Sequence, residues 1–147
     1  MAIFTERLSQ SLAVVGTIDP ASYNAQTNSD GVDMQLFRRV MFVISAGAIG
    51  NNTVAAVVKG GNNNSTFATT LTGKSLSAST FSGSGDNNSQ AIIEVMAEEC
   101  ATQDVRYIRL ELTPSGAAHL SAVVLAGVAR YEPAVDYDLA SVEQIVA

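Results

Sequence analysis

Cysteine, histidine and tryptophan are nearly missing from this sequence. It has one cysteine, Cys100, one histidine, His119, and no tryptophan. A single thiol cannot form an intrachain disulfide, and metal sites need several Cys, His or carboxylate ligands at set spacing. The preceding Glu98 and Glu99 disfavour a reactive thiolate at Cys100. We therefore expect no metal, no cofactor and a fold that rests on a hydrophobic core, in a reducing compartment.

Charged residues are also scarce. They make up 15% of the 147 residues, against about 25% in an average soluble domain, and the net charge is −6. A nucleic-acid partner is not expected, because it would need a basic patch and only Arg38–Arg39 and the pair Arg106/Arg109 cluster. Two interpretations of the low charge stay open: a β-rich domain padded with Ser, Thr, Asn and Gly, or a surface covered by neighbours, since obligate interfaces are depleted in charge.

Long hydrophobic runs are missing as well. No segment reaches about 18 consecutive apolar residues, so no membrane partner is expected. Residues 1–7 lack the basic region, apolar stretch and small-residue cleavage site of a signal peptide. These features predict synthesis in the cytoplasm, with use there or packaging into a particle.

The length suits one domain with its own core, and the pattern divides it into three regions. Residues 1–13 form an N-terminal arm, 14–131 carry the strand signals, and 132–147 form an acidic C-terminal tail. In the arm, the apolar residues recur at helix-like spacing, which fits a short amphipathic helix or an extended arm that lies on a neighbour. These residues are Ile3, Phe4, Leu8 and Leu12.

The middle region predicts an all-β fold. Strand signals, rich in β-branched and aromatic residues and bounded by Gly, Asn, Ser and Pro, recur every 10 to 15 residues or so. The segments are 37–46, 53–58, 65–70, 74–81, 90–97, 105–113 and 119–130. About seven or eight strands without a long helix indicate a single-domain antiparallel β-sandwich or barrel, jelly-roll-like, with an extended arm and tail.

Two of these segments carry more detail. The alternation over 105–113 breaks near Tyr107–Arg109, which predicts a bulge or register shift there. The apolar run 119–130 predicts a central strand buried on both faces. A helix over 117–129 is the alternative, which Ala and Leu favour but Val123, Val124 and Gly127 disfavour.

No catalytic constellation is visible. His119 has Ser115 and Ser121 nearby, but adjacency along a strand does not build a triad. Glu98 and Glu99 would face opposite sides of a strand, and Glu94 would pair with Arg106 or Arg109 across neighbouring strands. The sequence thus predicts a protein that is not an enzyme.

The polar loops 60–65 and 82–88 match no ligand motif. They lack the lysine and following helix of a phosphate loop, and the acidic spacing of a calcium loop. They are read as mobile tips, or as ligand-binding loops on a rigid β scaffold.

One set of segments resembles a known class. Residues 32–43 combine VDM, two further residues and FR ahead of an apolar strand, and form the most specific part of the pattern. The other parts are 8–12, 16–20, 48–50, 53–54, 92–95 and 106–110. Together they are similar to small virion proteins encoded in the structural-gene clusters of tailed phages, in particular capsid decoration (cement) proteins.

This resemblance implies a β-sandwich or barrel core, homo-oligomers that are often trimers, and a terminal arm laid on the capsid shell. It implies the major capsid protein as partner, location on the virion, and stabilisation of the head. Within the arm, the residues expected to bind the partner are Ile3, Phe4, Leu8 and Leu12. Two alternatives remain: a tail or head–tail connector component, and a host-surface or carbohydrate-binding module that uses residues 62–64 and 86–88.

Overall fold

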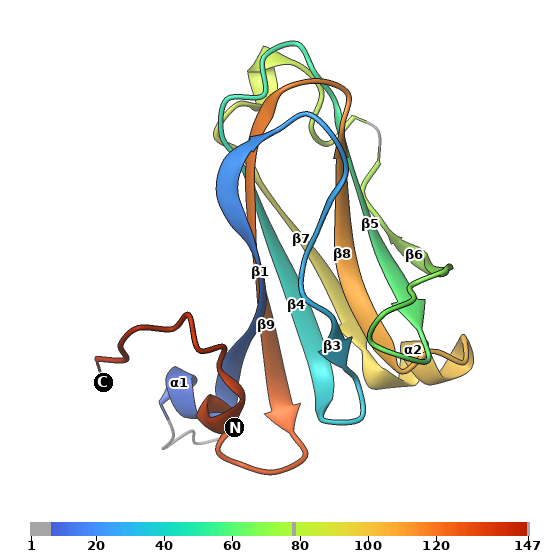
Figure 1. Cartoon of the computed structure of the whole chain (residues 1–147), viewed down its shortest axis with the longest axis vertical. Helices are drawn as coiled ribbons and strands as arrows, with labels where there is room; N and C mark the ends of the chain where they lie inside the picture. The colour runs from blue at the N-terminus through green and yellow to red at the C-terminus, as the bar shows by residue number, and fades with distance from the viewer. Residues whose placement is uncertain (1–6, 78, 147) are drawn as a thin grey trace, which may run out of the picture.

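The computed structural model describes residues 7–77 and 79–146, which form two β-sheets packed face to face (Figure 1). One sheet has the strand order β1-β9-β4-β7, and the other has the order β2-β8-β5-β6, with β3 also on β8. The strands are β1 (Leu12–Tyr23), β2 (Thr27–Asn28), β3 (Val32–Asp33), β4 (Phe37–Ala46), β5 (Val54–Gly61), β6 (Thr69–Ser75), β7 (Gln90–Met96), β8 (Tyr107–Pro114) and β9 (Ala118–Ala129). Short helices are α1 (Leu8–Ser11), α2 (Ala97–Thr102), η1 (Ser84–Asp86) and η2 (Ala134–Tyr137).

The strand order is that of a jelly roll. β2 and β3 both run antiparallel to β8, with Thr27 opposite Leu112 and Val32 opposite Ile108, so together they act as one interrupted strand. All named strand pairs are antiparallel. Counting β2 and β3 as one gives two four-stranded sheets with jelly-roll connections. The predicted all-β antiparallel sandwich is confirmed.

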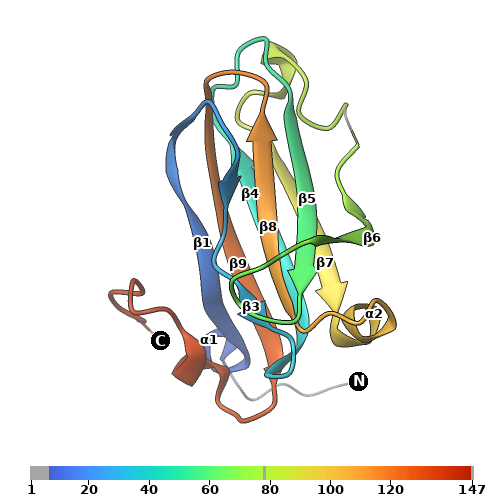
Figure 2. The ribbon, with the colours of Figure 1, turned by 45° about the vertical axis from the view of Figure 1, so that its right-hand side comes forward.

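The core lies between the two sheets, and the two-residue period of the strands fills it. On β4, Val40, Phe42 and Ile44 point inward and are at most 2% exposed. Ile108 and Leu110 of β8 face them from the other sheet and are fully buried. Figure 2 shows the two layers in profile, with β4 and β9 behind β8 and β5.

Several predicted strands lie where the sequence placed them, and others do not. Residues 37–46 coincide with β4, whereas the two weak candidates 65–70 and 74–81 are replaced by the single strand β6. The register of β8 on β5 is continuous. On its other side the register shifts by one residue between Asn28 opposite Glu111 and Val32 opposite Ile108. The register shift predicted near residues 107–109 therefore lies on the side of β2 and β3, and Asp104, ahead of the strand, has a φ of +53°.

The apolar segment 119–130 forms the central strand β9, between β1 and β4, and the helical alternative is wrong. Its inward residues Leu120, Ala122 and Val124 are buried. The prediction that both faces are buried is wrong, because the outward Val123 is 40% exposed.

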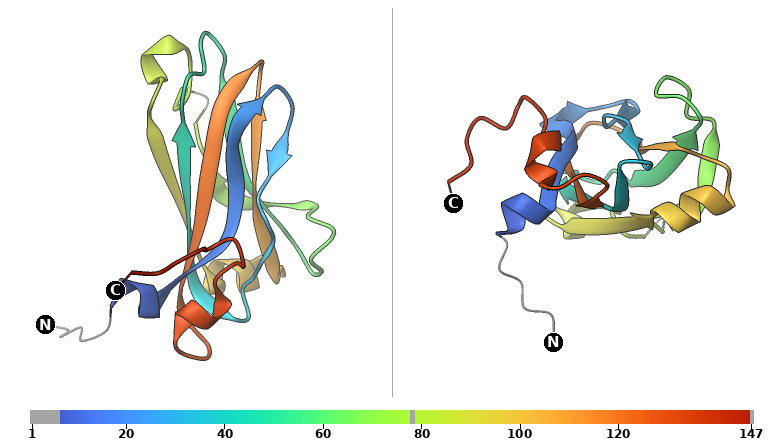
Figure 3. Two further views of the ribbon diagram at one scale, coloured as in Figure 1. Left: turned by 60° about the vertical axis from the view of Figure 1, so that its left-hand side comes forward. Right: turned by 90° about the horizontal axis from the view of Figure 1, so that it is seen from below.

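The C-terminal segment folds back on the edge strand β1. Tyr137 packs its ring against Phe37 at 5.2 Å between centroids, and Ala134 is fully buried. The backbone N–H of Val14 donates to Asp138 Oδ1 at 2.6 Å, and that of Leu139 donates to the Val14 carbonyl at 2.8 Å. Figure 3 shows this segment beside α1 and β1. It thereby occupies hydrogen-bonding groups on the free edge of β1.

The second sheet carries one ion pair between β3 and the start of β8, and another within β8. Arg106 Nη2 lies 2.6 Å from Asp33 Oδ2, and Arg109 Nη2 lies 2.7 Å from Glu111 Oε1. The predicted pairing of Glu94 with either arginine is wrong, because Glu94 belongs to β7 in the other sheet. The expectation for Glu98 and Glu99 is also wrong: they lie in α2, where Glu99 accepts the Met96 N–H at 2.9 Å.

The carboxyl of Asp33 links stability to pH. Burial raises its pKa, but hydrogen bonds from Arg106 and from the Gln35 backbone N–H outweigh burial, and the pKa lies below that of a free aspartate. A carboxyl with a lowered folded-state pKa stabilises the fold above its unfolded pKa, and this contribution is lost as the pH falls through the folded value.

We expect Asp33→Asn to lower the free energy of unfolding by about 1 kcal/mol at pH 7. The difference from wild type should shrink as the pH falls below the ordinary aspartate range of about 4. Urea denaturation at several pH values measures both effects. The control is Asp104→Asn, an exposed aspartate without an ion pair to another described residue. An equal deficit for Asp33→Asn at all pH values would contradict the assignment.

Candidate assembly surface

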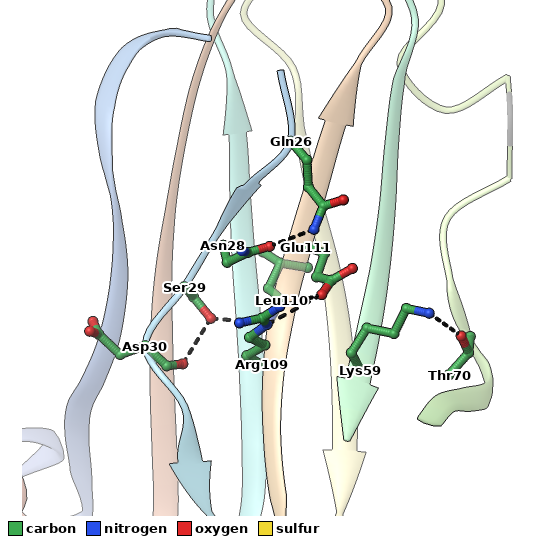
Figure 4. A network of polar contacts seen from close by, with 9 residues as sticks. All are labelled: Gln26, Asn28, Ser29, Asp30, Lys59, Thr70, Arg109, Leu110 and Glu111. Atoms are coloured by element: carbon green, nitrogen blue, oxygen red, sulfur yellow. Dashed lines mark hydrogen bonds and ion pairs between the residues drawn. The ribbon is translucent and has the colours of Figure 1, made fainter. Parts of the chain in front are cut away.

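The outer face of the second sheet is polar and partly covered. Arg109 and Glu111 of β8 pair there, and Lys59 Nζ of β5 donates to Thr70 Oγ1 at 2.6 Å (Figure 4). The guanidinium of Arg109 lies 4.5 Å from the ring centroid of Phe67, which follows the Asn-rich loop. Arg109 is thus paired with a carboxylate within the chain, and Lys59 is hydrogen-bonded to a hydroxyl.

The loop ahead of Phe67 is held by its own amides. Asn63 Oδ1 accepts hydrogen bonds from the backbone N–H groups of Ser65 and Thr66, at 3.0 and 2.7 Å. In the other polar loop, Asn87 Oδ1 accepts the Ile49 N–H at 2.8 Å. The two loops lie at opposite ends of β5, since Ser82 pairs near its start at Thr53 and Thr69 pairs near its end. The residues predicted for a single glycan site are therefore far apart.

The outer face of the sheet β1-β9-β4-β7 has the opposite character, and we name it the apolar face. Its side chains stand in rows that the strand register defines. From β1 to β7 the rows are Leu12, Gly127, Arg39 and Met96; Val14, Leu125, Met41 and Glu94; Thr17, Val123, Val43 and Ile92; and, from β9, Ser121, Ser45 and Gln90.

Large apolar side chains on this face are open to solvent. Ile92 is 57% exposed, and Met96 and Val123 are each 40% exposed. Arg39 and Glu94 are the charged residues in the rows, and neither forms an ion pair with another described residue. Exposed apolar side chains that are grouped on one face are a candidate interaction surface.

A groove of about 520 Å³ crosses the lower part of the apolar face, between α1 and the strands. Gly127 forms part of its lining, and the Leu12 side chain packs over it, with Cδ2 2.9 Å from the point where a Cβ of Gly127 would stand. The lining residues are Leu8, Ser11, Leu12, Arg39, Val40, Met41, Glu94, Leu125, Gly127, Val128 and Glu132. Apart from Arg39 and two glutamates, the groove is therefore lined by apolar and small side chains.

Two of the four predicted partner-binding residues line this groove. Leu8 stands on α1 and is 76% exposed, and Leu12 is the first residue of β1. Ile3 and Phe4 lie outside the described residues. No sequence pattern points directly to Met41 and Leu125, although segment 119–130 is predicted to be buried on both faces.

Val128, which lines the groove, has an unusual backbone. Its φ is +54°, a left-handed conformation that is a clear outlier for a β-branched residue. Its side chain is 50% exposed, so its own burial contributes little to offset this strain. Strain of this kind costs on the order of 1–3 kcal/mol and is found at functional surfaces.

Groups that could perform chemistry stand apart from each other. His119 is exposed at the start of β9 and makes no side-chain hydrogen bond within the described part of the chain. Burial and the Glu99 carboxylate raise the pKa of the Cys100 thiol to about 11, so it stays protonated. Within residues 7–77 and 79–146, no cluster of three metal-ligating side chains is found. The helices of that part are all too short to span a membrane.

Comparison with known proteins identifies relatives of the fold. No protein-family model and no curated protein matches the sequence. Among solved structures, the chain is similar to the VP2 subviral particle of infectious bursal disease virus, with a TM-score of 0.53 and 12% identity over 84% of this chain and 34% of the other. It is also similar to the T=1 particles derived from that virus, with a TM-score of 0.51 and 14% identity over 84% and 33%. The chain spans about a third of those chains, and the likeness concerns the fold.

We expect Val128→Gly to raise the free energy of unfolding by about 1 kcal/mol, because glycine adopts positive φ without strain. Val123→Gly, also partly exposed but in regular strand conformation, should lower it by about 1 kcal/mol. Chemical denaturation of both variants measures the contrast. A Val128→Gly variant less stable than wild type would show that this position is not strained.

Proposed function

We propose that this protein is a virion structural component that works by assembly, and that it decorates and stabilises a capsid shell by binding the major capsid protein. The observation that carries the proposal is a jelly roll whose apolar outer face is left open to solvent. A fold of the same kind is found in proteins of the subviral and T=1 particles of infectious bursal disease virus.

Composition and surface chemistry support the same proposal. Charged residues are 15% of the chain. The ion pairs among the described residues lie on the second sheet or at α2, away from the centre of the apolar face. A charge-poor apolar face loses little hydration when it is covered, and its burial contributes roughly 25 cal/mol per Å² before the costs of association.

We propose that this protein is not an enzyme. His119 lies exposed and alone, and the Cys100 thiol is buried and protonated. A nucleophile and a base within hydrogen-bond reach are the minimum for covalent catalysis, and the described residues bring no such pair together around His119 or Cys100.

We further propose that the N-terminal arm makes the contact with the shell. Leu8 and Leu12 already line the groove, and Ile3 and Phe4 precede them in the sequence. Arm residues that bury apolar side chains on a neighbour would add contact area on the shell.

The test uses capsids of the parent virus assembled without this protein. We expect full-length Phe4→Asp and Leu8→Asp variants to bind them at least tenfold more weakly than wild type, because a buried carboxylate costs more than 1.4 kcal/mol. Leu8 is exposed in the isolated chain, so its variant should keep the wild-type melting temperature. Co-sedimentation at increasing protein concentration gives the affinities.

The control is Ala55→Asp, an exposed position on the outer face of the second sheet, which should bind like wild type. Unchanged binding by both arm variants would contradict the role of the arm. Electron microscopy of saturated particles tests the location: many copies spread over the shell support decoration, whereas a small ring at one vertex would indicate a connector or tail component.

A further inference from the structure

We infer that the apolar face binds the same face of a second copy of this chain, about a two-fold axis that lies in the plane of contact. This inference goes beyond the proposed function: it assigns the apolar face to a second copy of the chain and leaves the N-terminal arm as the proposed contact with the shell. It rests on the charge pattern, the strand register and the apolar character of the face.

The charge pattern is self-complementary. Arg39 on β4 and Glu94 on β7 stand diagonally on neighbouring strands, because Arg39 is opposite Met96 and Glu94 is opposite Met41. Both lack an ion-pair partner among the described residues. A two-fold contact pairs residue i with j and j with i. One cation and one carboxylate on each copy therefore form two equivalent ion pairs across the contact.

The strand register allows this geometry. Strands of a sheet lie about 4.8 Å apart, and alternate residues along a strand lie about 6.7 Å apart. A two-fold axis that bisects the line from Arg39 to Glu94 places Arg39 of each copy opposite Glu94 of the other. The same axis sets Val123 opposite Val14 and leaves Met41 close to its own counterpart.

The same axis also brings apolar side chains together. It carries Ile92, the most exposed of the apolar side chains in the rows at 57%, toward Leu12 and Gly127 of the second copy. Leu12 lies over Gly127, with Cδ2 2.9 Å from the point where a Cβ of Gly127 would stand. A projecting isoleucine on each copy thus meets an apolar side chain on the other.

The area suits a weak, reversible contact. Four strands and four rows cover about 19 Å by about 27 Å, or about 500 Å² on each copy. Because the axis crosses the strands of the two copies, the faces overlap only in part, and the contact buries less than about 1,000 Å² in total, as weak and transient interfaces do.

Charge reversal tests the inference on the purified full-length protein, without capsids. We expect Arg39→Glu and Glu94→Arg each to raise the dimer Kd at least tenfold, because each change places like charges opposite each other twice. The double variant Arg39→Glu/Glu94→Arg should return the Kd to within about threefold of wild type. Sedimentation velocity over a concentration series measures all four proteins, and circular dichroism melts confirm that each is folded.

Ile92→Glu should also abolish the dimer, whereas Thr113→Glu, exposed on the outer face of β8, should not. A wild-type protein that stays monomeric at several hundred micromolar would overturn the inference. An oligomer that the single variants leave unchanged, such as the trimer that the resemblance implies, would also overturn it. The inference would fail too if the double variant had a dimer Kd as high as that of the single variants. Because no capsid is present, these outcomes leave the decoration proposal to its own test.

Discussion

The two-residue period of β4 and β9 decides which side chains the fold buries and which it leaves to solvent. On one side of these strands, Phe42 and Val124 meet Leu110 of the opposite sheet and are fully buried. On the other side, Met41, Val123 and their neighbours are also apolar, and the described part of the chain leaves them partly exposed. The core therefore fixes the exposed face as firmly as the buried one, because a shift of one residue would exchange the two.

Much of the architecture could be read from local patterns. The strand at 37–46 and the central strand near 119–130 are long, apolar and bounded by turn residues, and each lies within a residue or two of its predicted bounds. The sandwich class followed from the number and spacing of such segments. The weakest predictions were short polar strands such as β6, where Thr and Ser leave little periodicity and the pairing with β5 decides the boundaries.

The rest depended on contacts between distant segments, which no local pattern contains. The partner of Arg106 is Asp33, 73 residues away, and Glu94 could not be assigned to a sheet before the strand order was known. The sequence predicts only part of the apolar face. It predicts that segment 119–130 is apolar on both sides, but the topology decides whether its outer side meets a helix, a loop or solvent. The sequence predicts Leu8 and Leu12 as partner-binding residues, whereas only the strand register places Met41 and Leu125 on the same face.

The hydrogen bonds between the C-terminal segment and Val14 have a consequence for how copies of this protein can join. An unprotected outer strand invites another chain to extend the sheet by main-chain pairing. Asp138 and Leu139 occupy that position on β1, and Lys74 reaches the Glu94 carbonyl on the opposite margin. Both edge strands of this sheet are thereby hindered from pairing with a strand of another chain. Face-to-face packing of sheets remains the open route for association, and it favours closed assemblies over fibres.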